Sequence, residues 1–63
     1  MAIYTTTTGD TTGTMLIITG HLASYGVDLY SASYDKVSEV LTLELSETLL
    51  PEYAEHLSLT LVE

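Results

Sequence analysis

The stretch VSEVLTLELS, from Val37 to Ser46, decides the expected fold. Apolar and polar residues alternate along it, so Leu41, Leu43 and Leu45 fall on one side of an extended chain. A helix would spread these three leucines around its circumference, and the pattern therefore predicts a strand with one buried face. The segment LSLTLVE, residues 57–63, repeats the alternation with leucines at the same spacing. The two leucine stripes are expected to face each other across one core.

Turn-forming residues divide the rest of the chain into further short segments. Three more strands are predicted, from Ala2 to Thr8, from Thr14 to Gly20 and from Val27 to Tyr34. β-Branched residues favour the first, four successive apolar residues the second, and alternation the third. The glycines and aspartate in residues 9–13 predict a hairpin between the first two strands, and residues 35–36 predict a second hairpin.

One short helical turn is predicted near Pro51 to His56. Pro51 suits the first turn of a helix, and Glu52 suits its positive end. The expected fold class is therefore mainly β, with about five short antiparallel strands in a small SH3-like barrel or a two-layer sheet. Residues 1–63 are expected to form a single small β domain, in which residues 1–13 are either an extended arm or an edge hairpin.

The composition points to association with another chain. A domain of this size buries only about 60% of the surface that its unfolded chain exposes. Yet 46% of the 63 residues are apolar, and the mean hydropathy is +0.30. The chain has no cysteine for disulfide bonds or thiolate metal sites. A homo-oligomer or a larger protein assembly is the simplest way to bury the remaining apolar surface.

The charge excludes several classes of partner. The formal net charge is −8, from nine acidic residues against Lys36. One cation cannot neutralise a run of phosphates, so neither direct nucleic-acid binding nor binding to anionic membranes is expected. The amino-terminal residues have no basic group ahead of an apolar run, and the longest apolar run, Met15 to Ile18, is too short to span a bilayer. We expect no signal peptide and no transmembrane segment, which leaves the compartment open, with a virion as one setting.

The sequence offers only weak candidates for catalytic or metal chemistry. Glu52, Glu55 and His56 share one helical face, and together with His21 they present carboxylate and imidazole ligands. Nothing in the sequence makes these groups converge, and a surface pair of Glu52 with His56 explains them better. No serine is marked as a nucleophile, and there is no glycine-rich phosphate loop. We expect no enzymatic activity, no cofactor, and no catalytic or metal site.

Two functions remain. The first is a structural protein that acts by self-assembly, such as a minor virion or capsid-decorating subunit. Its predicted interface residues are Ile3, Tyr4, Met15, Ile17, Tyr30 and Tyr34. The alternative is an acidic DNA mimic, an inhibitor that occupies the basic groove of a nucleic-acid-processing enzyme, in which case the partner is a basic protein. The acidic second half of the chain is also explained as a solvated face that keeps the protein soluble.

Overall fold

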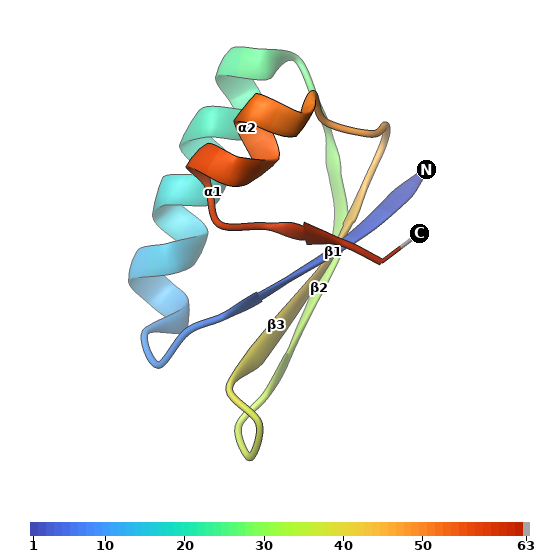
Figure 1. The fold of residues 1–63 in the computed structure, drawn as a ribbon. Helices are drawn as coiled ribbons and strands as arrows, with labels where there is room; N and C mark the ends of the chain where they lie inside the picture. The colour runs from blue at the N-terminus through green and yellow to red at the C-terminus, as the bar shows by residue number, and fades with distance from the viewer. Residues whose placement is uncertain (63) are drawn as a thin grey trace.

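The computed structural model describes residues 1–62 and shows a mixed α/β fold. The elements in order are β1 (Ala2–Thr7), α1 (Thr11–Tyr25), β2 (Leu29–Asp35), β3 (Val40–Leu45), α2 (Pro51–His56) and β4 (Thr60–Leu61). The four strands form one open antiparallel sheet in the order β2-β3-β1-β4. Both helices lie over the same face of this sheet (Figure 1). The prediction of short antiparallel strands is confirmed, but the mainly β barrel or two-layer sheet is wrong, because a helical layer replaces the second layer of strands.

The largest correction concerns α1. The predicted strand from Thr14 to Gly20 lies inside this 15-residue helix, so the predicted hairpin with the first strand does not exist. Asp10 caps the helix, since its Oδ1 accepts the backbone N–H of Gly13 at 3.0 Å. Gly26, with a φ of 74°, ends the helix in the left-handed conformation. Four successive apolar residues fit a buried strand and a helix equally well, and these two caps favour the helix.

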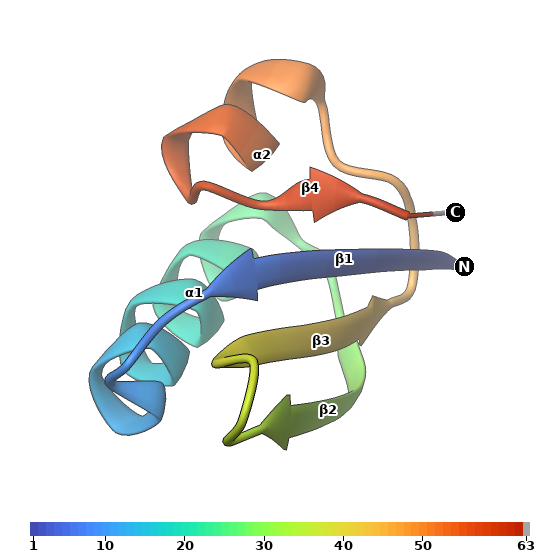
Figure 2. The ribbon, with the colours of Figure 1, turned by 60° about the horizontal axis from the view of Figure 1, so that its bottom comes forward.

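The first strand, β1, lies in the interior of the sheet. It pairs with β3 along its whole length and with β4 at Tyr4 and Thr5 (Figure 2). Residues 1–13 are therefore neither an extended arm nor an edge hairpin, which corrects the sequence prediction. In the sheet β3 separates β1 from β2, so β1, α1 and β2 form a split β-α-β unit. The edges of the sheet are β2 and the two-residue β4.

Within the stretch from Val37 to Ser46, only Val40–Leu45 forms a strand. β3 begins at Val40, and the residues before it form the turn from β2. Within this turn Val37 is 95% exposed and Glu39 has a φ of 58°. A positive φ of this kind is typical of turns and is not found in a strand. The alternating pattern of the sequence therefore extends into the turn, where the chain is no longer extended. The buried leucines of the stripe are as predicted: Leu41, Leu43 and Leu45.

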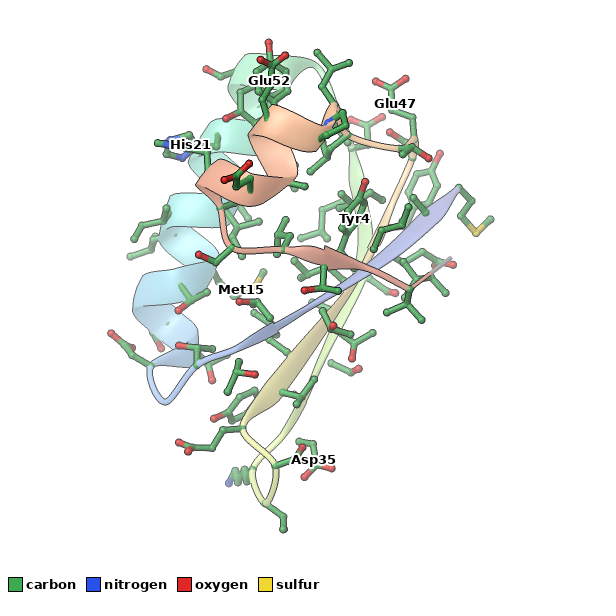
Figure 3. The ribbon with its side chains drawn as sticks, in the orientation of Figure 1. Tyr4, Met15, His21, Asp35, Glu47 and Glu52 are labelled. Carbon is green, nitrogen blue, oxygen red and sulfur yellow. The ribbon has the colours of Figure 1, made fainter. Side chains whose placement is uncertain are left out.

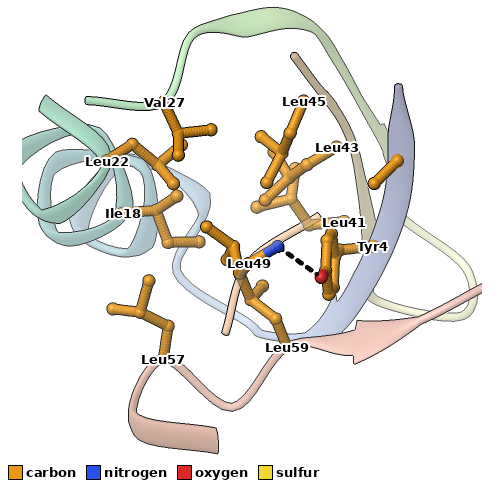
Figure 4. Packing of buried hydrophobic residues seen from close by; sticks show 11 residues of the cluster. Tyr4, Ile18, Leu22, Val27, Leu41, Leu43, Leu45, Leu49, Leu57 and Leu59 are labelled. Carbon is orange, nitrogen blue, oxygen red and sulfur yellow. Dashed lines mark hydrogen bonds between the residues drawn. The ribbon is translucent and has the colours of Figure 1, made fainter. Parts of the chain in front are cut away.

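The core lies between the sheet and the helices (Figure 4). It consists of Ala2, Tyr4, Ile18, Leu22, Val27, Leu41, Leu43, Leu45, Leu49, Leu57 and Leu59. The two leucine stripes thus share one core, as predicted, except that Leu61 on the edge strand β4 is half exposed. The Tyr4 hydroxyl accepts the backbone N–H of Leu49 at 2.9 Å. Within residues 1–62, every buried side-chain nitrogen or oxygen has a hydrogen-bond partner.

Candidate interaction surface and histidine pair

The outer face of α1 carries two large exposed apolar side chains and no carboxylate or lysine. The helix has no Asp, Glu, Lys or Arg, although the chain as a whole has nine acidic residues and one lysine; it does carry the imidazole of His21. Its inner face places Ile18 and Leu22 in the core, whereas Leu16 and Ile17 are 71% and 59% exposed. Beside them is a shallow hollow of about 310 Å³, lined by Leu16, Ile17, Gly20, His21 and Ser24. We call Leu16, Ile17, Gly20 and Ser24 the α1 patch.

Gly20 has no evident role within the monomer. A Cβ atom placed on it meets no atom within 4 Å. Glycine in a helix interior is less stable than alanine by about 0.5–1 kcal/mol. Gly13 differs, because a Cβ there collides with the Asp10 carboxylate that caps the helix. Gly20 leaves the helix backbone open to close approach by another molecule.

Four aromatic side chains form the contact between α1 and α2. The rings of Tyr25 and Tyr53 are stacked, with centroids 4.0 Å apart and planes 5° apart. One helical turn away, the imidazoles of His21 and His56 have centroids 5.3 Å apart and are tilted by 54°. The Nδ1–H of His21 donates to the carbonyl oxygen of Ile17 at 2.8 Å. Because a carbonyl only accepts, the neutral His21 ring has its acceptor at Nε2.

The histidine pair borders a cavity of about 300 Å³. Its polar lining residues are Thr6, Thr7, Thr8, Thr14, His21, His56 and Ser58. No carboxylate or lysine is among the residues that line it, and Ile17, Ile18 and Leu57 complete the lining. Ser58 has a φ of 57°, and it follows the carboxyl end of α2, a position that usually favours glycine.

The predicted interface residues do not form one surface. Tyr4 is 1% exposed and belongs to the core, because its strand is central and its side chain points toward the helices (Figure 3). Met15 and Tyr34 are half-buried against the core, and the Tyr34 hydroxyl donates to the carbonyl oxygen of Thr8 at 2.7 Å. Tyr4 is therefore withdrawn from contact with a partner, whereas Met15 and Tyr34 stay partly accessible and their interface role stays a prediction.

The other three predicted residues are accessible but lie apart. Ile17 belongs to the α1 patch, and Tyr30 is exposed on the edge strand β2. Ile3 is half-buried on the face of the sheet that points away from the helices. The sequence prediction missed Leu16 and Gly20 because it assigned them to a strand. The signals that identify them are the helix caps and the absence of charge over the whole helix.

The expected ligand groups converge only in part. His21 and His56 are brought together, whereas Glu52 and Glu55 do not join them in a larger cluster. In the described part of the chain, no group of three or more His, Cys, Asp or Glu side chains is arranged to hold a metal ion. Over the same residues, no helix has both the length and the apolar character needed to cross a membrane.

The acidic residues are found at both ends of the molecule. Asp35 lies at the β2–β3 turn, and Glu47 and Glu52 lie at the opposite end (Figure 3). Glu44 occupies a third position, on the helix-free face of the sheet, where Ser31 is its partner on β2. None of these four carboxylates belongs to the α1 patch.

Comparisons with known proteins found no relative: no protein-family model matches this chain, and no curated protein or solved structure matches it.

Proposed function

We propose that this protein is a non-enzymatic structural subunit that assembles with copies of itself through the α1 patch. The supporting observation is the exposure of Leu16 and Ile17 around Gly20 on a helix that has no charged residue. Exposed apolar side chains that adjoin one another on a soluble chain are typical of protein interaction sites.

The absence of carboxylates from the α1 patch favours a second copy over a basic partner at this surface. Each copy has a formal net charge of −8, so two copies repel each other wherever their acidic surfaces meet. The α1 patch places no carboxylate in such a contact. For the same reason it provides nothing for the lysines and arginines of a basic protein to bind.

The shape of the patch suits a twofold contact between two α1 helices. Leu16 and Ile17 project beside the hollow at Gly20, so each copy has both a projection and a recess. In a symmetric dimer the same surface serves both partners, and the leucine of one copy fits over the glycine of the other. The missing side chain at Gly20 allows the two helix backbones to approach closely.

The energies predict a weak contact. Burial of two apolar side chains from each copy contributes up to about 6–12 kcal/mol. The loss of translational and rotational freedom costs about 4–15 kcal/mol. Association should therefore depend on concentration. An assembly such as a virion or capsid surface suits a weak contact, because many tethered copies raise the effective concentration.

Sedimentation equilibrium tests the proposal. The wild-type chain should associate reversibly as its concentration rises from about 1 to 500 µM, and Leu16→Glu should remain monomeric because it places a carboxylate in the patch. Val37→Glu is the matched control, since it replaces another exposed aliphatic residue with glutamate, in the β2–β3 turn. A wild-type chain that stays monomeric throughout, or a Val37→Glu variant that dissociates as fully as Leu16→Glu, would contradict the proposal.

A further inference from the structure

Histidines 21 and 56 are the only two in the chain, and the fold places them against each other. His21 lies on α1 and His56 lies on α2, 35 residues later in the sequence. The stacked Tyr25 and Tyr53 hold the two helices together one turn away, so the imidazole pair is built on a supported contact. Such support matters because ligand groups bind a metal ion well when the scaffold fixes them beforehand.

The distance between the rings fits two ligands of one metal ion. Zinc–nitrogen bonds are about 2.0–2.1 Å long, which puts the centroid of each coordinating imidazole about 3.2 Å from the ion. Two such rings at a tetrahedral angle of about 109° have centroids about 5.2 Å apart. The observed separation of the His21 and His56 centroids is 5.3 Å.

The hydrogen bond of His21 leaves one ring nitrogen free. Its Nδ1–H donates to the carbonyl oxygen of Ile17, which leaves the Nε2 lone pair free to bind an ion. A backbone carbonyl is a common second-shell partner of metal-binding histidines, because it fixes both the tautomer and the orientation of the ring.

The charge of the chain also favours a cation. The formal net charge is −8, and the single lysine, Lys36, lies in the β2–β3 turn. The neighbouring Asp35 is far from His21 (Figure 3), so no lysine competes with a metal ion at the histidine pair. Imidazole nitrogen prefers Zn²⁺ and Cu²⁺ to Mg²⁺ or Ca²⁺, which prefer oxygen.

We infer that His21 and His56 form a two-imidazole binding site for a borderline transition-metal ion, of the Zn²⁺ or Cu²⁺ class, where α1 meets α2. Water completes the coordination, since structural zinc sites have four protein ligands and this pair supplies two. The ion therefore exchanges with solvent, and it links the two helices while it is bound. This inference does not depend on self-assembly.

Calorimetric titration of Zn²⁺ into the full chain tests the inference. One ion should bind per chain, and His21→Ala and His56→Ala should each weaken binding by at least about tenfold, because one imidazole alone is a poor ligand set. Glu52→Gln is the matched control, since it removes a carboxylate from α2 and keeps both histidines. Mg²⁺ should bind far more weakly than Zn²⁺.

Two further measurements keep the test independent of folding and of assembly. In the wild-type chain, Zn²⁺ should shift the NMR signals of both histidine rings together. Leu16→Glu should bind Zn²⁺ as tightly as the wild type, because it keeps both imidazoles. Unchanged affinity in either histidine variant, equal losses in Glu52→Gln, equal binding of Mg²⁺, or ring signals that do not move would each overturn the inference.

Discussion

Two solvent-facing surfaces of this protein differ in the polarity of their exposed side chains. The outer face of α1 presents Leu16 and Ile17 with no charged residue along the helix. In the part of the chain that the structure describes, the other surface is the sheet face without a helix over it (Figure 2). One register row across that face consists of hydroxyl side chains: Thr60, Thr5, Thr42 and Ser33.

The difference makes the α1 face the better candidate for a contact between copies. Hydroxyl groups on the sheet form hydrogen bonds with water, and the apolar residues Ile3 and Val40 lie in separate rows on either side of them. In the α1 patch, Leu16, Ile17 and Gly20 have no polar side-chain atoms, and the Ser24 hydroxyl is the one polar side-chain group. An uncovered sheet face is therefore compatible with a monomer, whereas the exposed helix face favours association.

The inner and outer faces of α1 should respond very differently to truncation. Ile18→Ala should reduce the free energy of unfolding by about 2–5 kcal/mol, because it leaves a cavity in the core. Ile18 is 1% exposed, whereas Leu16 is 71% exposed. Leu16→Ala should therefore change the stability of the monomer by less than about 0.5 kcal/mol. Urea unfolding at low protein concentration measures both, and equal losses would mean that Leu16 also belongs to the core.

The next largest effect concerns Tyr4, whose side chain lies in the core between the sheet and the helices. Tyr4→Phe keeps the ring but removes the oxygen that accepts the Leu49 N–H. A buried N–H without an acceptor costs about 1–3 kcal/mol, so the variant should unfold at a lower urea concentration with an unchanged m-value. Its self-association should be unaffected, since Tyr4 lies in the core; loss of association with normal stability would place Tyr4 at the interface instead.

Strand β3 and helix α2 were predictable from sequence, but α1 was not predicted. The leucine alternation from Leu41 to Leu45 has the period of a strand, and Pro51 marks the start of a helix. The run Met15 to Ile18 has no period of its own, so the prediction depended on its flanks. Asp10 and Gly26 provide both helix caps, yet Asp10 was assigned to a hairpin loop.

The candidate sites were less predictable than the strands. The nearly uncharged first half of the chain was visible in the sequence, and Ile17 was among the predicted interface residues, a role that stays a prediction. It did not show that Leu16 and Gly20 share the same exposed face, because that depends on the helical period. The pairing of His21 with His56 depends on how α1 and α2 pack, and no local pattern encodes a contact of that kind.

Gly20→Ala separates folding from assembly because its two effects have opposite signs. Alanine should stabilise the helix by about 0.5–1 kcal/mol, and the added Cβ has open space within the monomer. The same methyl group fills the hollow that the proposed dimer gives to the second helix, so self-association should weaken. Thermal unfolding at low concentration and sedimentation at high concentration measure the two effects. A higher unfolding temperature together with unchanged self-association would show that Gly20 is not part of the proposed interface.

The smallest effect is expected on the open face of the sheet. Ser33→Glu adds a carboxylate to an exposed position of β2, at the end of the hydroxyl row, and should change stability by less than about 0.5 kcal/mol. If α1 forms the contact between copies, this variant should associate like the wild type, whereas Leu16→Glu should not. Sedimentation of the two variants at the same ionic strength compares the surfaces directly. Dissociation by Ser33→Glu alone would show that the sheet face, with its hydroxyl row, is the surface through which the copies assemble.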